Sequence, residues 1–214
     1  MEITILCTDN KHKIIPFLQK WKKLNSDNHN ISIVNHSSEV NTGDILFLIS
    51  CLEIIKEDVR KKFQHTLVIH ESDLPRGRGW SPIQWQILNG LNSITVTLLD
   101  AAEKVDSGDV WKKETVKFEE HQLQNEINEQ IFPIKLNLID FAIKNCNLIK
   151  KTMQKNIDEP HFERRTPKDS EIDVDKSISE QFNLLRIADD ERYPCFFKYK
   201  GHKYKIILTK IDTE

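Results

Sequence analysis

Residues 44–50, with the sequence DILFLIS, form an almost unbroken apolar run of strand length. A strand without polar residues at alternate positions is typical of one covered on both faces, as in a parallel sheet. Further short runs with strand character lie at 3–7, 31–34, 66–70, 94–99 and 110–118. Because helical patterns separate several of these runs, we predict an α/β fold: a Rossmann-like, mostly parallel sheet with helices on both faces.

Four segments before Lys155 carry helical signals. Apolar spacing predicts helices at 13–24 and 54–63. Ser81-Pro82 is a good helix start, and Asn89-Gly90 a good stop, so a third helix should run to about Leu88. Residues 122–153 are predicted as one long helix, interrupted near Pro133.

The composition changes after Lys155, where prolines and many charges predict an exposed connection. Beyond it, a short helix is expected at 179–187 and a hairpin at 195–210, turned at 200–202. The sequence therefore predicts a larger α/β domain over residues 1–157 and a small C-terminal α+β appendage with a β-hairpin over residues 158–214.

Charge and cysteine content argue against some classes of protein, although a near-balanced charge does not exclude a tRNA substrate. The net charge is -2, whereas a nucleic-acid-binding protein usually has a basic surplus. Scattered cysteines without C-x-x-C spacing indicate reduced thiols rather than a metal site; they are Cys7, Cys51, Cys146 and Cys195. No signal-peptide pattern and no apolar run of membrane-spanning length is present, so we expect a cytoplasmic protein without a membrane partner. The first predicted strand is not followed by a glycine-rich turn, which argues against an NAD site or a P-loop.

The most informative stretch is LVIHESDLPRGRGWSPIQWQILNG, followed by ITVTLLDAAEKVDSGDVW. His70 ends a predicted strand, where sites form in open α/β sheets, and Asp106 lies in a later loop. Each residue alone has a simpler interpretation, as a polar strand terminus or as part of a turn. A zinc-protease helix is excluded because the second histidine is missing and the local pattern is a strand.

The order of the motifs is more specific than any of them. His70, Ser72, Leu74-Pro75, Arg78-Gly79, Asn89-Gly90 and Asp106-x-Gly108 follow one another as in one known family. Over roughly residues 40–115 the sequence resembles the N10-formyltetrahydrofolate-dependent formyltransferases. The resemblance implies transfer of a formyl group from N10-formyltetrahydrofolate, as co-substrate, to an amine without a metal. The family has an Asn two positions before the His, and here that position is Val68, so another donor, such as a backbone amide, a water or the Ser72 hydroxyl, is expected to replace it.

The resemblance also implies roles for individual residues. His70 would donate to the oxyanion, and Asp106 would orient His70 and accept or relay the amine proton. The expected cofactor-binding residues flank a slot for the pterin: Ser50, Cys51, Leu52, Ile54, Ala102, Glu103 and Val105. The expected substrate-binding residues are Ser72, Arg78, Gly79, Trp80 and Arg165.

Three features favour an amino sugar as the acceptor of the formyl group. They are the GRGWSP sequence at residues 77–82, which places Trp80 beside the loop that follows His70, the short acidic tail around 169–175, and the ending RRTPKDSEID. They resemble the sugar N-formyltransferase branch, in particular the enzymes of pseudaminic acid pathways. The implied acceptor is UDP-4-amino-4,6-dideoxy-N-acetyl-altrosamine, for surface glycan biosynthesis.

Other acceptors stay open at this point: a dTDP-amino sugar, glycinamide ribonucleotide or methionyl-tRNA. A non-catalytic relative that only binds folate or a nucleotide is a further alternative. The same resemblance makes a homodimer an alternative to a monomer, and the sequence does not decide between them.

Overall fold

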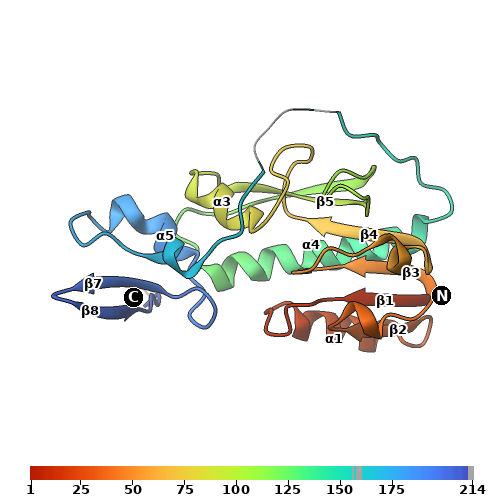
Figure 1. The fold of residues 1–214 in the computed structure, drawn as a ribbon, viewed down its shortest axis with the longest axis horizontal. Coiled ribbons are helices and arrows are strands. Elements are labelled where there is room, and N and C mark those ends of the chain that lie inside the picture. Colours follow the sequence, from red (N-terminus) through yellow and green to blue (C-terminus); the bar gives the residue numbers. More distant parts are fainter. Residues whose placement is uncertain (156, 158–160, 212–214) are drawn as a thin grey trace.

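A six-stranded sheet forms the centre of the molecule (Figure 1). The computed structural model describes residues 1–155, 157 and 161–211. The strand order is β2-β1-β3-β4-β5-β6; the first four strands are parallel, and β5 pairs antiparallel with both of its neighbours, β4 and β6. The strands are β1 (Glu2–Leu6), β2 (Asn30–Val34), β3 (Gly43–Leu48), β4 (Phe63–His70), β5 (Ser93–Asp100) and β6 (Val110–Lys117).

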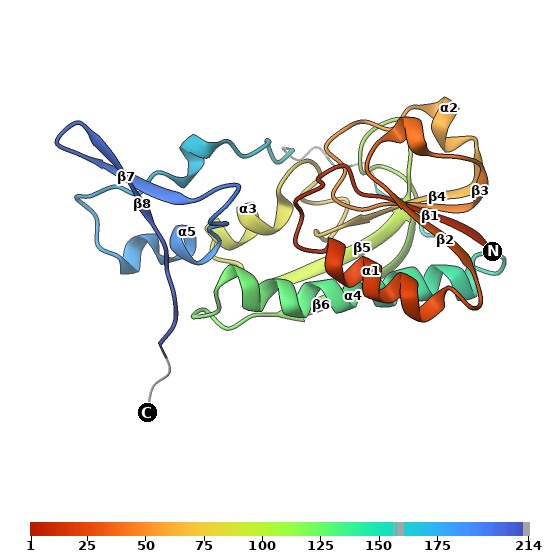
Figure 2. The same cartoon turned by 90° about the horizontal axis from the view of Figure 1, so that it is seen from below.

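Helices cover both faces of this sheet, which confirms the predicted α/β class. The two long helices, α1 and α4, lie side by side on one face and bury the larger apolar core (Figure 2). A smaller apolar cluster on the other face lies under η1 and α2. The helices are α1 (Ile15–Asn25), α2 (Glu57–Arg60), α3 (Pro82–Leu88), α4 (Gln124–Asn145) and α5 (Phe182–Arg186), with the 3-10 turns η1 (Ser37–Glu39), η2 (Pro167–Ser170) and η3 (Ser179–Gln181).

Two helices were predicted with the wrong bounds. The helix predicted over 54–63 is only the single turn α2, because β4 already begins at Phe63. The helix predicted over 122–153 ends at Asn145 and is continuous through Pro133. The lost hydrogen bond at Pro133 is offset by the apolar side of α4, which is buried against the sheet.

After α4 the chain returns along the outer strand of the sheet. Thr152 and Val110 exchange two backbone hydrogen bonds, each 2.8 Å long, and Lys151 forms an ion pair with Asp100. A backbone held this way is extended rather than helical, which is why the apolar spacing of this segment was misleading.

The C-terminal segment contains α5 and the predicted hairpin, formed by β7 (Cys195–Tyr199) and β8 (His202–Ile206). Positive φ at Lys200 and Gly201 matches the turn expected between such strands. The division of the chain at residues 157 and 158 stays a prediction, because residues 156 and 158–160 lie outside the described residues. Within the described ranges, no helix has both the length and the apolar character needed to cross a membrane.

Arg186 attaches the C-terminal segment to the sheet. Its side chain is 1% exposed, and its guanidinium donates to Asn183 Oδ1 (2.9 Å), to the Glu119 carbonyl (3.1 Å) and to Asn92 Oδ1. Asn92 precedes β5 and Glu119 follows β6. One buried cation therefore ties α5 to the end of the β5–β6 pair where β5 begins and β6 ends.

We expect Arg186→Met to lower the free energy of unfolding by roughly 2–4 kcal/mol, because it leaves buried acceptors without donors. Urea denaturation measures this. Lys198→Met is the matched control, since it removes only an exposed ion pair with Glu171 and should cost less than about 1 kcal/mol. Equal losses in the two variants would contradict the role given to Arg186.

Candidate active site

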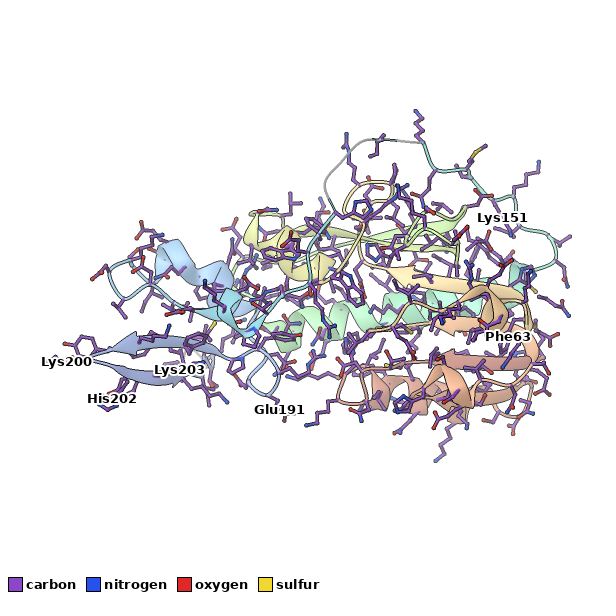
Figure 3. The ribbon with its side chains drawn as sticks, viewed as in Figure 1. Phe63, Lys151, Glu191, Lys200, His202 and Lys203 are labelled. Atoms are coloured by element: carbon purple, nitrogen blue, oxygen red, sulfur yellow. The ribbon has the colours of Figure 1, made fainter. Side chains whose placement is uncertain are left out.

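A cavity lies at the carboxyl ends of the parallel strands. The C-terminal segment lies beyond this end of the sheet (Figure 1). Its wall includes Leu48 and His70 from the ends of β3 and β4, and Asp9 from the loop after β1. The C-terminal segment contributes residues of the 164–165 and 187–193 stretches. Figure 3 shows Glu191, the neighbour of Arg192, at the end of the sheet opposite Phe63, with which β4 begins. Two parts of the chain thus enclose one site.

The structure brings His70 and Asp106 together in the wall of this cavity. Both are nearly buried, and His70 Nδ1 lies 3.6 Å from Asp106 Oδ2. His70 Nε2 lies 2.9 Å from the Gly77 carbonyl. Because a carbonyl oxygen can only accept, Nε2 carries a hydrogen and Nδ1 faces the carboxylate.

Asp106 reaches His70 because the β5–β6 loop turns back over the sheet. The pairing of β5 with β4 ends with Asp100 opposite Leu67, three residues before His70. Asp106 then adopts a left-handed backbone conformation (φ 54°), and its Oδ2 accepts a hydrogen bond of 3.0 Å from the Gly79 amide. Gly108 is required at its position, since a Cβ there would lie 1.9 Å from the Asp100 carbonyl oxygen.

Gly79 is the second position where only glycine fits. Its φ is 107°, and a Cβ would lie 2.3 Å from the Phe162 carbonyl oxygen. Phe162 lies this close because its backbone pairs with the residues on either side of Gly79. Phe162 N donates to Arg78 O (2.8 Å), and Trp80 N donates to Phe162 O (2.9 Å). The Arg-Gly-Trp loop is therefore held directly against the segment that continues into Arg164 and Arg165.

Most of the residues predicted for the pterin slot line the cavity: Ser50, Cys51, Leu52, Ile54, Ala102 and Val105. Glu103 lies outside the lining. Leu52, Ile54 and Val105 are large apolar side chains that remain substantially exposed, so they form an apolar rim. Burial raises the pKa of the Cys51 thiol to about 12, and the thiol donates to the Leu6 carbonyl, so it stays neutral beside this rim.

The residues predicted for the acceptor divide into two groups. Gly79, Trp80 and Arg165 line the cavity, whereas Ser72 and Arg78 are buried outside its lining. Val68 does line the cavity, so an apolar side chain faces the site where the resembled family has an amide. The Ser72 hydroxyl, named above as a replacement donor, has no hydrogen-bond partner among the described atoms.

The two arginines of the RRTP sequence have different surroundings. Arg164 is exposed and lies over the Trp80 ring, 5.3 Å from its centroid. Arg165 is buried and donates to the Asp169 carbonyl (3.0 Å) and the Ser170 hydroxyl (3.1 Å). Burial lowers the pKa of Arg165, partly opposed by the Asp169 carboxylate. Arg165 thus holds the segment in place, and Arg164 is the more available cation.

Comparison with known proteins shows the family of this chain. Residues 3–136 match the family model described as formyl transferase. The chain belongs to the formyl transferase family. This match contains both His70 and Asp106.

Three similar proteins show the range of this formyl transferase family. The bifunctional polymyxin resistance protein ArnA of Wigglesworthia glossinidia brevipalpis is 29% identical over 206 residues, covering 94% of this chain and 30% of ArnA, so the chain spans less than a third of that relative. A methionyl-tRNA formyltransferase from Clostridium thermocellum has the same fold (TM-score 0.85, 23% identity, 99% and 94% of the two chains covered). So does a sugar N-formyltransferase from Shewanella sp FDAARGOS_354 (TM-score 0.74, 16% identity, 100% and 99% covered).

Sequence reasoning missed the polar end of this formyl transferase cavity. His12 follows β1, and burial together with the nearby Lys135 lowers its pKa to about 4. The Ile14 amide donates to His12 Nδ1 (3.1 Å), so the neutral ring carries its hydrogen on Nε2. His12 therefore offers a neutral donor. The only sequence signal was a short polar stretch after the first strand, which is equally typical of a turn.

Charged residues complete this end. Lys135, on α4, is 1% exposed and forms an ion pair with Glu71. Burial alone would raise the pKa of Glu71, but Lys135 outweighs it and holds that pKa below its ordinary value. Arg192 forms ion pairs with Asp9 and with Asp189 (2.8 Å), which joins the C-terminal segment to the β1 loop. In the part of the chain that the structure describes, no three His, Cys, Asp or Glu side chains are grouped to hold a metal ion.

The lowered pKa of His12 predicts a specific acid sensitivity. Because protonation is easier in the unfolded chain, with its ordinary pKa of 6.5, than in the folded protein, the contribution of His12 to stability is full above pH 6.5 and is lost as the pH falls toward 4. Compared with His12→Asn, the wild type should lose about 2 kcal/mol of additional stability between pH 7.5 and pH 5. Urea denaturation of both proteins at the two pH values measures the difference, and parallel pH dependence would contradict it.

Proposed function

We propose that this chain transfers the formyl group of N10-formyltetrahydrofolate to the amine of a nucleotide-linked amino sugar. The observation that carries the proposal is the buried His70–Asp106 pair between an apolar rim and a polar end of one cavity. The rim suits a flat heteroaromatic ring, and the polar end suits a hydroxylated, phosphorylated acceptor. N10-formyltetrahydrofolate supplies the activated formyl group in this reaction.

The geometry gives His70 and Asp106 a defined task in this proposal. The attacking amine must lose a proton, and the leaving folate nitrogen must gain one. Since His70 Nε2 already donates to Gly77, a further proton can be held between His70 Nδ1 and Asp106 Oδ2. The pair can therefore accept the proton from the amine and return it as the carbon–nitrogen bond to the folate breaks.

The developing negative charge on the formyl oxygen needs a hydrogen-bond donor, and Val68 supplies none. We propose that His70 Nε2 exchanges the Gly77 carbonyl for the substrate oxygen when the substrate binds. A preorganised donor of this kind is worth roughly 3–4 kcal/mol of the activation barrier. Because Ser72 is buried away from the lining, it is the weaker candidate for this donor.

Contacts at the cavity entrance favour a nucleotide sugar over other amines. Trp80 presents an aromatic surface with the Arg164 guanidinium beside it, a combination that suits a base or sugar ring carrying phosphate. His12 Nε2 and Lys135 are donors at the inner end, where sugar hydroxyls can accept. As the specific acceptor we propose UDP-4-amino-4,6-dideoxy-N-acetyl-altrosamine, in the biosynthesis of a surface glycan. The fold shared with a methionyl-tRNA formyltransferase makes methionyl-tRNA the second candidate.

A cytoplasmic location and a homodimer stay predictions.

One assay separates these acceptors. The protein is incubated with N10-formyltetrahydrofolate and, in turn, UDP- and dTDP-linked amino sugars, glycinamide ribonucleotide and methionyl-tRNA, and the release of tetrahydrofolate is followed. We expect release with a nucleotide sugar. Release with methionyl-tRNA or glycinamide ribonucleotide alone would move the assignment to that branch. Tight folate binding without release from any acceptor would favour the non-catalytic relative.

His70→Asn and Asp106→Asn should each lower kcat at least about 100-fold, because either change removes the site for the transferred proton. Steady-state kinetics with the best acceptor and thermal unfolding together measure the effect. His65→Asn is the matched control, since His65 lies on the same strand but packs against Trp111 outside the cavity lining. Near-normal rates in either site variant would overturn the role of the pair.

Trp80→Leu and Arg164→Met should each raise the KM for the nucleotide sugar about 10-fold, with the KM for the folate changed less than twofold. The reason is that both side chains line the entrance rather than the apolar rim. Lys168→Met, which also removes an exposed cation but lies outside the lining, serves as the control. An equal rise in the KM of both substrates would contradict the assignment.

A further inference from the structure

Gln154 connects the two loops of the active site although it lies outside the cavity lining. Its Nε2 donates to the Asp106 carbonyl (2.9 Å) and to the Gly108 carbonyl (2.7 Å). Its Oε1 accepts a hydrogen bond of 2.9 Å from Arg78 Nη2. Both hydrogens and the oxygen of one amide are thus used, each on a residue next to or within the site.

The turn that Gln154 contacts needs such support. Asp106 adopts a left-handed backbone conformation. Residues other than glycine rarely adopt it unless their surroundings impose it. The same turn points the Asp106 carboxylate toward His70 and the Gly79 amide. A shift of the two carbonyls would therefore move the carboxylate as well.

Gln154 is itself anchored by contacts outside the site. Thr152, two residues earlier, forms two backbone hydrogen bonds with Val110 at the start of β6, and Lys151 pairs with Asp100 at the end of β5. These contacts hold the segment on the two strands that the turn connects. Arg78, the third partner, is buried one residue before Gly79, whose amide binds the Asp106 carboxylate.

We propose that Gln154 is a positioning residue that holds the Asp106–Gly108 turn and the Arg78–Gly79 loop in register. It acts from outside the cavity, so that the Asp106 carboxylate stays directed at His70. The kinetic part of this proposal rests on the proposed formyl transfer, and the structural part does not. No shorter or charged side chain can replace Gln154: Asn lacks one methylene of reach, and Glu places an acceptor against two carbonyl oxygens.

The test compares Gln154→Met and Gln154→Glu with Gln181→Met. Gln181, at the end of η3, is the matched control because its Nε2 also donates to backbone carbonyls, among them Asp173 O at 2.9 Å, and because it lies outside the cavity lining. We expect the Gln154 variants to lower kcat about 10- to 100-fold with both KM values changed less than twofold, the effect of a misplaced catalytic group. Gln154→Glu should be at least as impaired as Gln154→Met, and Gln181→Met should keep wild-type kinetics.

Hydrogen exchange of the peptide 101–110 provides a readout independent of activity. Exchange should be faster in Gln154→Met than in the wild type and unchanged in Gln181→Met. Unchanged exchange, a kcat within twofold of wild type, or a loss expressed mainly in KM would each overturn the proposal. If the wild type shows no formyl transfer with any acceptor, the proposed function fails, and the exchange rates alone decide whether Gln154 holds the turn.

Discussion

The hydrogen bond from the Gly79 amide to the Asp106 carboxylate is the contact on which the rest of the site depends. It joins the loop after β4 to the loop between β5 and β6, and it leaves the same carboxylate oxygen 3.6 Å from His70 Nδ1. Two glycines make it sterically feasible, since a Cβ at Gly79 or at Gly108 would overlap a neighbouring carbonyl oxygen. This approach brings Asp106, in the loop between β5 and β6, next to His70 at the end of β4.

The C-terminal segment takes part in the site as well as in the fold. Its backbone pairs with the Arg78–Trp80 stretch, and Arg192 binds Asp9 in the loop after β1. The resulting cavity is chemically asymmetric, with an apolar rim at Leu52, Ile54 and Val105 and a charged end at Lys135 and Arg192. This asymmetry matches a reaction between a flat cofactor-like donor and a polar acceptor, which is the function proposed for this member of the formyl transferase family.

Local signals predicted the fold well where one element explains its own pattern. The DILFLIS strand, the helix that begins at Pro82 and the hairpin turn at Lys200-Gly201 form as expected, although the Ser81 side chain makes no capping hydrogen bond. The predictions were wrong where tertiary contacts outweigh local preference. Burial of α4 tolerates Pro133, and pairing of Thr152 with Val110 extends a segment whose apolar spacing resembled a helix.

The sequence by itself determined the fold class and the order of motifs that resembles the formyltransferases, and this resemblance named His70 and Asp106 as candidate catalytic groups. The fold class could be determined because strand ends, turns and glycines are encoded by neighbouring residues. Only the tertiary structure decided that Ser72 and Arg78 lie outside the cavity, that His12 and Lys135 line its polar end, and that Gln154 donates hydrogen bonds to the Asp106 and Gly108 carbonyls. The physical reason is that these contacts join residues far apart in the chain, whose meeting depends on the return path of the backbone and leaves no pattern in any one segment.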